Sequence, residues 1–407
     1  MIKRWLAVLS LAGCGGGAVG TQFFDTKFGT DGKTLTAFAC VNDDAFANAV
    51  VAVDGGFVVA GLGCGGWGFA GYTSSGAPDP VFGDGGTTLL FPSAGAFSQV
   101  NQLIARPDGR LLARGSLNSK MPIRQLSRAG VVDATFATNV DEAMSSNGGL
   151  ASAMALQPDG KLLILDRGTL LRVTATGEPD LTFGSLGFTT FSGTTGTYFS
   201  KMVLKADGHI VLVSFAFPDE DTEVLQLTAS GARDTAFGTN GSMKLVRPAN
   251  GALTVWSAAA QADGKVILAG TGYEKEGALV EPLVWRVTAA GVLDTTFGTN
   301  GRATGGATIG NNRFYAVSLV ADGKLLAVGN RETDSLADAW QAERFTSDGK
   351  PDTAFADKGT LVFPMTTASI SGGAMSVVDT AEGYVLAGRA FRSSGGKTVF
   401  GIARVLP

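Results

Sequence analysis

The chain has 407 residues, of which 45% are apolar and 17% are charged, and its formal charge is −4 at pH 7. This length permits several ordinary domains, and the apolar content suffices for a large core. A mildly acidic chain with scattered charges lacks the basic patch that nucleic-acid binding requires. The chain also contains no run of 18 apolar residues, so no membrane-spanning segment is predicted. Glycine is the outlier at 58 residues, and it indicates many short strands joined by tight turns.

The first residues are typical of an export signal. Lys3 and Arg4 form a positive region, and a short apolar run over 5–11 follows them. The segment Leu11-Ala12-Gly13-Cys14 then resembles a bacterial lipoprotein signal, in which cleavage precedes the cysteine and lipid is added to it. The alternative is an ordinary secretory signal with a chance cysteine.

The lipoprotein resemblance also implies a location. Gly15, rather than Asp, follows Cys14, which implies sorting to the outer membrane in a host with two membranes. We therefore expect a cell-envelope protein that meets the membrane through its lipid anchor only. The expected division is a signal peptide over 1–13, a lipidated cysteine and flexible tether over 14–22, and one folded unit over 23–407.

A nine-residue phrase recurs along the rest of the chain, and its clearest copy is Leu293-Asp294-Thr295-Thr296-Phe297-Gly298-Thr299-Asn300-Gly301. Its aspartate occurs seven times at spacings of 47 to 60 residues, at Asp25, Asp79, Asp133, Asp180, Asp234, Asp294 and Asp352. A second phrase, clearest as Gln157-Pro158-Asp159-Gly160-Lys161, alternates with the first. Two alternating markers indicate a repeat architecture.

Each repeat predicts four antiparallel strands. In the fifth repeat they are expected over 257–261, 266–270 and 283–288, with a fourth near residue 302. Seven such units predict an all-β fold, a seven-bladed β-propeller. The last unit lacks the first phrase and the fourth strand, which are found instead over 25–38. The N-terminal strand is therefore predicted to join the last blade and close the ring.

The two phrases resemble those of the bacterial delta-60 repeat, a family associated with propeller-like folding. The resemblance covers nearly everything from Asp25 to Pro407. It implies the identity of the repeat and no particular activity, because the family brings no shared catalytic motif.

Both phrases are predicted to lie on one regular face of the propeller, and the longer variable loops lie on the other, where function usually concentrates. Four acidic residues of the variable face are candidates for binding a cation or a basic partner: Asp219, Asp221, Glu223 and Glu274. The alternative is a set of solvated loops. The aromatic residues Trp67 and Tyr273 are candidates for stacking on sugar or binding protein, or else for packing between blades.

The channel lining is predicted by counting six residues back from each acid of the second phrase. This position holds Asn48, Gln102, Ala153, Lys201, Ser257, Ala316 and Ser376. Period-two alternation would point these side chains into the channel and their successors into the blade packing. Lys201 is the only charge in the ring, and it is either an anion site or a hydrated lysine.

No metal or cofactor is predicted. The phrase at Asp294 has too few carboxylates for a calcium loop, and a turn is favoured, in which Asp bonds local backbone, Phe packs between blades and Gly adopts positive φ. The only histidine, His209, replaces a turn lysine and has no catalytic setting. Cys40 and Cys64 are predicted to lie on the variable face of adjacent blades, where a disulfide is one of two open alternatives.

These patterns leave three functions open. The favoured one is a monomeric, non-enzymatic binding scaffold whose partner is an envelope protein or glycan. The second is a carbohydrate-active hydrolase or lyase that uses variable-face carboxylates. The third is a purely architectural protein. A fold alone does not choose among them.

Overall fold

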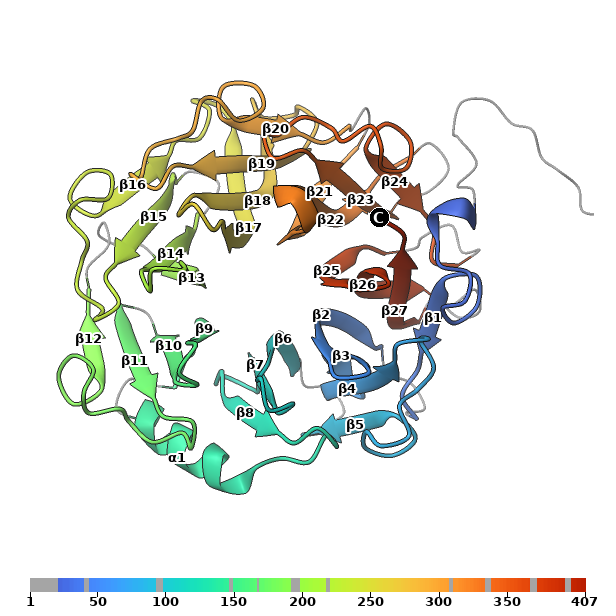
Figure 1. Ribbon diagram of the computed structural model, residues 1–407, viewed down its shortest axis with the longest axis horizontal. Coiled ribbons are helices and arrows are strands. Elements are labelled where there is room, and N and C mark those ends of the chain that lie inside the picture. Colours follow the sequence, from blue (N-terminus) through green and yellow to red (C-terminus); the bar gives the residue numbers. More distant parts are fainter. Residues whose placement is uncertain are drawn as a thin grey trace, which may run out of the picture.

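The seven-bladed β-propeller predicted from the sequence is confirmed: seven sheets form a ring around a central channel (Figure 1). The structure is a computed structural model. It describes residues 21–39, 44–92, 98–145, 149–166, 168–191, 198–216, 220–306, 310–333, 338–366, 372–391 and 397–407.

Blades 1 to 4 follow one another along the chain, and their strands run from the channel outward. Blade 1 consists of β2 (Phe46–Val53), β3 (Gly56–Gly63), β4 (Gly66–Thr73) and β5 (Thr87–Leu90). Blade 2 consists of β6 (Gln99–Ala105), β7 (Leu111–Ser116) and β8 (Ile123–Leu126), followed by α1 (Ala134–Ser145). Blade 3 consists of β9 (Ala153–Leu156), β10 (Leu162–Asp166), β11 (Thr169–Val173) and β12 (Phe188–Thr190). Blade 4 consists of β13 (Tyr198–Leu204), β14 (Ile210–Phe215), β15 (Thr222–Leu227) and β16 (Ser242–Leu245).

Blades 5 to 7 complete the ring. Blade 5 consists of β17 (Ala252–Ala260), β18 (Val266–Tyr273), β19 (Glu281–Val287) and β20 (Arg302–Thr304). Blade 6 consists of β21 (Arg313–Leu319), β22 (Leu325–Arg331), β23 (Ala339–Phe345) and β24 (Thr360–Phe363). Blade 7 consists of β25 (Ala374–Thr380), β26 (Gly383–Phe391), β27 (Thr398–Val405) and β1 (Lys33–Thr36). Two short 3₁₀ turns are η1 (Thr21–Phe23) and η2 (Ala321–Gly323).

The ring closes as predicted, because β1 is the outer strand of the last blade. It pairs antiparallel with β27, from Lys33 opposite Ala403 to Thr36 opposite Phe400. Figure 1 shows the two ends of the described chain meeting in this blade. The pairing covers the outer edge of β27, which would otherwise be an open sheet edge.

Blade 2 departs from the four-strand pattern, because α1 follows its third strand. The other six copies of the phrase end on a glycine with positive φ, as at Gly301, where φ is +88°. Blade 2 has Val140 there, and a β-branched side chain disfavours that conformation. Asp133 caps the helix instead, since its Oδ1 accepts a hydrogen bond from the Phe136 amide at 3.0 Å.

The hydrophobic core is divided among the seven interfaces between blades. Each interface holds one cluster of buried apolar side chains, and each cluster contains one phenylalanine of the first phrase. These are Phe28, Phe82, Phe136, Phe183, Phe237, Phe297 and Phe355, all at most 1% exposed. The prediction that this residue packs between blades is confirmed.

The first phrase is a structural turn with one component that the sequence analysis missed. Asp294 Oδ1 accepts hydrogen bonds from the Thr296 amide at 3.2 Å and its hydroxyl at 2.6 Å, as a local turn requires. Asp294 Oδ2 also accepts from Arg286 Nε at 2.8 Å. The guanidinium lies 4.7 Å from the centre of the Phe297 ring. We call this Arg–Asp–Phe unit the staple.

The staple recurs in other blades with the arginine eight residues before the aspartate. Arg172 pairs with Asp180 and Arg344 with Asp352, each at 2.7 Å. The two phrases lie on the same face, as predicted, because lysines of the second phrase reach the same carboxylates: Lys161 with Asp180 at 2.9 Å and Lys324 with Asp352 at 3.0 Å. In these blades the regular face is therefore occupied by its own ion pairs.

Candidate functional site

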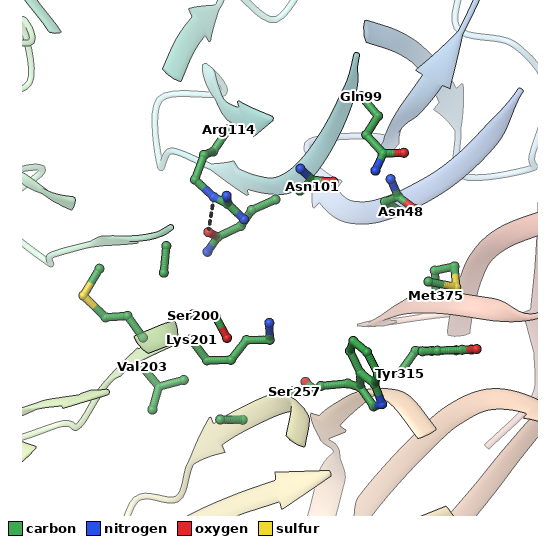
Figure 2. Close-up of a pocket in the computed structure, with 15 residues that line it drawn as sticks. Asn48, Gln99, Asn101, Arg114, Ser200, Lys201, Val203, Ser257, Tyr315 and Met375 are labelled. Carbon is green, nitrogen blue, oxygen red and sulfur yellow. Dashed lines mark hydrogen bonds between the residues drawn. The ribbon is translucent and has the colours of Figure 1, made fainter. Parts of the chain in front are cut away.

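A cavity of about 430 Å³ lies in the central channel, and every innermost strand contributes to its wall (Figure 2). Its lining is Asn48, Gln99, Asn101, Gln102, Arg114, Ala153, Ser200, Lys201, Met202, Val203, Trp256, Ser257, Ala258, Tyr315 and Met375. The volume lies in the range of small-molecule sites, about 300–1,000 Å³. The lining includes two cations and no carboxylate.

β-Bulges build this wall. The innermost strands of six blades slip register by one residue against their neighbours, and the bulged residues are Asn48, Asn101, Ser200, Trp256, Tyr315 and Met375. All six line the cavity. A bulge places an extra residue opposite a single partner and redirects its side chain. The channel lining is therefore set by the bulges and departs from strict period-two alternation.

The predicted channel ring is shifted by one residue from this lining in most blades. Asn48 is a bulged residue, whereas Gln102, Lys201 and Ser257 follow one and still line the cavity. Ser376 does not line it, and its hydroxyl instead accepts a hydrogen bond from the Val50 amide of the next blade at 3.2 Å.

Polar residues of the ring also connect neighbouring blades. Gln102 Nε2 donates to the Met154 carbonyl at 2.8 Å, and its Oε1 accepts from the Met154 amide at 3.1 Å. Asn48 Nδ2 donates to the Val100 carbonyl at 2.9 Å. These two amides, predicted as ligand-binding groups, are therefore held by the backbone of the next blade.

Lys201 and Arg114 supply the positive charge of the cavity. Figure 2 shows the Lys201 side chain extending from β13 into the open space, with Arg114 across from it. Arg114 is buried and donates to two neutral acceptors, the Ala151 carbonyl at 3.0 Å and Gln102 Oε1 at 3.3 Å. Burial and the neighbouring charge of Arg114 lower the pKa of Lys201 to about 8, and burial lowers the pKa of Arg114 to about 10.

Arg114 was missed by the sequence analysis, although the repeat contains a signal for it. Arg114 lies opposite Gln102 in the register of β6 and β7. The equivalent position of the other six blades is apolar: Ala60, Leu165, Val213, Ala269, Val328 and Ala387. One charge in a column of apolar residues, on a strand that reaches the channel, marks a functional candidate.

Aromatic rings and unbonded polar atoms form the side of the cavity between β13 and β21. The rings of Trp256 and Tyr315 meet edge to face with centres 6.1 Å apart, and Phe215 packs on Trp256 at 5.9 Å. Trp256 Nε1 and Ser200 Oγ are buried and have no hydrogen-bond partner among the described residues. A ligand or a water molecule can satisfy these two atoms, because both lie at the cavity wall.

A smaller cavity of about 240 Å³ adjoins the first at the mouth of the channel. It shares Asn48, Tyr315 and Met375 with the larger cavity and adds Phe46, Arg313, Asn330, Asp338, Gly372, Gly373, Arg389 and Phe391. The new residues come from the starts of innermost strands and the ends of second strands, so this mouth opens on the variable face. The Arg389 guanidinium lies 4.4 Å above the Phe46 ring.

The remaining candidates lie outside both cavities. Asp221 accepts a hydrogen bond from the Arg247 amide at 3.1 Å, Glu223 is 3% exposed within β15, and Glu274 pairs with Arg302 at 2.6 Å on the surface. Trp67 is fully buried between blades 1 and 2, where its Nε1 donates to the Ser116 carbonyl at 2.7 Å, and Tyr273 ends β18 half-buried.

Three predicted residues, Cys14, Cys40 and Asp219, lie outside the described part of the chain. Cys64 is disulfide-bonded. Within the described residues, no three His, Cys, Asp or Glu side chains gather as a metal site. No helix of the described chain is long and apolar enough to cross a membrane.

Comparisons with known proteins support the propeller architecture. A family described as "Domain of unknown function (DUF5122) beta-propeller" matches residues 261–297, which supports propeller-type repeats. None of the curated proteins matches this sequence.

Two solved structures resemble the whole ring. One is a polysaccharide lyase of family PL25, an ulvan lyase bound to -[GlcA(1-4)Rha3S]-, with a TM-score of 0.53, 9% identity, and coverage of 91% of this chain and 96% of that chain. The other is the extracellular domain of a one-component system from B. thetaiotaomicron, with a TM-score of 0.50, 13% identity, and coverage of 95% of this chain and 40% of that chain. The chain thus spans about two fifths of that domain. At these identities the likeness shows the fold alone.

Proposed function

We propose that the protein is an exported β-propeller that acts as a non-enzymatic binding scaffold in the bacterial cell envelope, with the channel cavity as its ligand site. The observation that carries this proposal is the cavity wall. Six β-bulges direct side chains into one space, where Ser200 Oγ and Trp256 Nε1 have no partner among the described residues. A concave pocket with a few convergent polar groups and aromatic walls is the usual form of a small-ligand site.

Export and anchoring rest on the N-terminal sequence. Lys3, Arg4 and the segment ending in Cys14 have the pattern of a lipoprotein signal. The likeness of the fold to an extracellular domain supports an exported protein. The repeats are of the delta-60 type in this proposal, and the partner is an envelope protein or glycan that reaches the channel.

Thermal unfolding of the full-length protein tests the ligand site, with a panel of oligosaccharides and small molecules from envelope extract. A true ligand raises Tm, because at a concentration of 100 times Kd it adds about 2.7 kcal/mol to the stability. Trp256→Ala is expected to abolish this shift. The matched control is Tyr273→Ala, which removes an aromatic residue outside both cavities. If Tyr273→Ala loses the shift and Trp256→Ala keeps it, the site lies on the variable face and the channel proposal is wrong.

Labelling with a radioactive fatty acid tests the anchor. The wild-type protein is expected to incorporate label and to fractionate with membranes, whereas Cys14→Ser incorporates none and is released. Incorporation by the Cys14→Ser variant would contradict lipidation at this residue.

A carbohydrate lyase is the second candidate function, and Lys201 favours it. A lysine whose pKa is lowered to about 8 is partly neutral near pH 7, and a neutral amine can accept the proton removed next to a sugar carboxylate. The likeness to a polysaccharide lyase supports this candidate at the level of fold. A hydrolase that uses Asp221 or Glu274 is less well supported, because neither carboxylate lines a cavity.

The lyase candidate has its own test. Elimination removes the proton next to the carboxylate and breaks the glycosidic C–O bond at the neighbouring carbon, and the departing oxygen takes up a proton from water. The double bond that remains is conjugated to the carboxylate and absorbs in the ultraviolet. Incubation of the protein with uronate polysaccharides is expected to raise the absorbance only if the protein is a lyase, and Lys201→Met must then abolish the rise. A flat absorbance trace with bound polysaccharide favours the scaffold.

A further inference from the structure

Two positive side chains share the channel cavity and have no carboxylate beside them. Neither Lys201 nor Arg114 forms an ion pair within the described chain, and no Asp or Glu lines the cavity. Arg114 is only 7% exposed. By contrast, the equally buried Arg286 is paired with Asp294 at 2.8 Å. Lys201 and Arg114 therefore place two positive charges in the channel without a negative partner in the described chain.

Like charges in a partly buried space destabilise each other, and an anion relieves both. Burial and the charge of Arg114 already lower the pKa of Lys201. A bound anionic group would accept charge-assisted hydrogen bonds from both side chains, which are stronger than bonds between neutral groups. A neutral ligand would accept only weaker hydrogen bonds from this pair.

The rest of the cavity is suited to a sugar ring. Trp256 and Tyr315 offer apolar ring surface, and a sugar packs its C–H face on such rings. Ser200 Oγ and Trp256 Nε1 are unbonded and can pair with hydroxyl groups, and Gln99 and Asn101 add amides to the same wall. We infer that the channel cavity binds an acidic sugar, with its carboxylate or sulfate group against Lys201 and Arg114 and its ring against Trp256 and Tyr315. This inference rests on the proposed function and names the class of ligand for the same site.

Calorimetric titration of the full-length protein tests the inference with four probes: a glucuronate disaccharide, a sulfated disaccharide, the matched neutral disaccharide and inorganic sulfate. At least one acidic disaccharide is expected to bind ten times or more tighter than the neutral one and than inorganic sulfate. Equal affinity for the neutral disaccharide overturns the charge requirement. Equal affinity for inorganic sulfate overturns the sugar and leaves a simple anion site.

Substitutions at Lys201 test which group provides the charge. Lys201→Met is expected to weaken binding of the acidic disaccharide tenfold or more, whereas Lys201→Arg retains it. Arg114→Lys keeps a charge near the Gln102 and Ala151 acceptors and is expected to lose less affinity than Arg114→Met. Unchanged binding by Lys201→Met overturns the inference, provided that circular dichroism and Tm show a folded protein.

The pH dependence of binding gives a second readout. The titratable groups that face or adjoin Lys201 are Arg114 on β7, Tyr198 on β13 and Tyr315 on β21. Because the pKa of Lys201 is about 8 and that of Arg114 is about 10, affinity is expected to be constant just below pH 8 and to fall about tenfold for each pH unit between pH 8 and 10. Lys201→Arg is expected to remove this fall, and a fall that persists in Lys201→Arg contradicts the assignment.

The outcomes separate this inference from the proposed function. If no acidic sugar binds, but another compound raises Tm in the wild type and not in Trp256→Ala, the channel is a ligand site and only its ligand class is wrong. If no compound in either experiment binds in the channel, both the ligand class and the binding scaffold are wrong.

Discussion

Two groups of cations in this ring have opposite surroundings. On the regular face, Arg286 lies between the carboxylate of Asp294 and the ring of Phe297. In the channel, Arg114 and Lys201 lie together with only neutral acceptors around them. Both places are partly shielded from water, so the difference lies in the partners.

This contrast separates a structural charge from a charge available to a ligand. At the staple, burial opposes ionisation of Asp294, but hydrogen bonds from Thr296 and the charge of Arg286 hold the pKa of that carboxylate below its usual value. In the channel, burial and a second cation act in the same direction on Lys201. The charge of Arg286 is balanced by Asp294 within the protein. The charges of Lys201 and Arg114 are balanced only when an anion binds in the channel.

The largest expected effect is at the staple. Arg286→Ala leaves the buried Asp294 carboxylate unpaired, so the free energy of unfolding should fall by about 3–5 kcal/mol. Urea denaturation measures this change. The double variant Arg286→Ala with Asp294→Ala removes both charges and should be less destabilised than the sum of the single variants. Additive effects would mean that Arg286 and Asp294 are not energetically coupled, and the staple would then not be a structural ion pair.

The opposite sign is expected in the channel. Lys201→Met replaces an unpaired, partly buried cation with an apolar side chain of similar length, so the free energy of unfolding at pH 7 should rise by about 1–2 kcal/mol. Urea denaturation in ligand-free buffer checks this change. A clear loss of stability would show that the Lys201 charge has a structural partner.

The free energy of unfolding as a function of pH tests whether Lys201 is an unpaired, partly buried cation. The pKa of Lys201 is about 8 in the folded protein, against 10.5 for an ordinary lysine. Between these values the unfolded chain holds a proton that the folded chain has lost, so the stability contributed by this residue rises with pH. Relative to Lys201→Met, the wild type should gain about 3 kcal/mol from pH 8 to 10.5 and almost nothing well below pH 8. Subtracting the variant's curve removes the contributions of Lys33 and Lys205, whose pKa values are also lowered. A flat difference curve would contradict the shift.

The smallest effect is expected for an ion pair in the open. Lys265 pairs with Asp263 at 2.7 Å in an exposed turn of the second phrase. Lys265→Ala should change the free energy of unfolding by at most about 0.5 kcal/mol, because water and salt screen such pairs. Denaturation at low and high salt measures this change, and a loss as large as that of Arg286→Ala would show that pairing, rather than burial, decides stability in this ring.

The sequence predicted the ring because its signal is repeated. Seven copies of two phrases were sufficient for the blade count, the buried phenylalanines and the closing strand. The helix in blade 2 was not predicted, because it depends on the conformation that Val140 disfavours and on a cap by Asp133. Both residues are visible in the sequence, but their effect depends on local backbone geometry.

The site was predicted only in part, for a similar reason. Lys201, Gln102 and Asn48 were found by counting along the innermost strand, and all three line the cavity. Trp256 and Tyr315 were missed because a β-bulge shifts the alternation by one residue, and a bulge leaves no distinctive residue type. Arg114 was missed because it lies on the second strand of its blade, and its charge is distinctive only beside the apolar residues at the equivalent positions of the other six blades.

The closing strand has a consequence for how the protein folds. In an ordinary blade the staple joins residues eight positions apart, as for Arg286 and Asp294, whereas the closing copy joins Asp25 to Arg404 across 379 positions. In a flexible chain the longer loop costs about 3 kcal/mol more to close, because the entropic cost grows as (3/2)RT ln n. Contacts so distant in sequence slow folding. The strand near the start of this sequence can therefore take its final place only after β26 and β27 have formed, and a segment that is made early must remain unpaired until the last blade is complete.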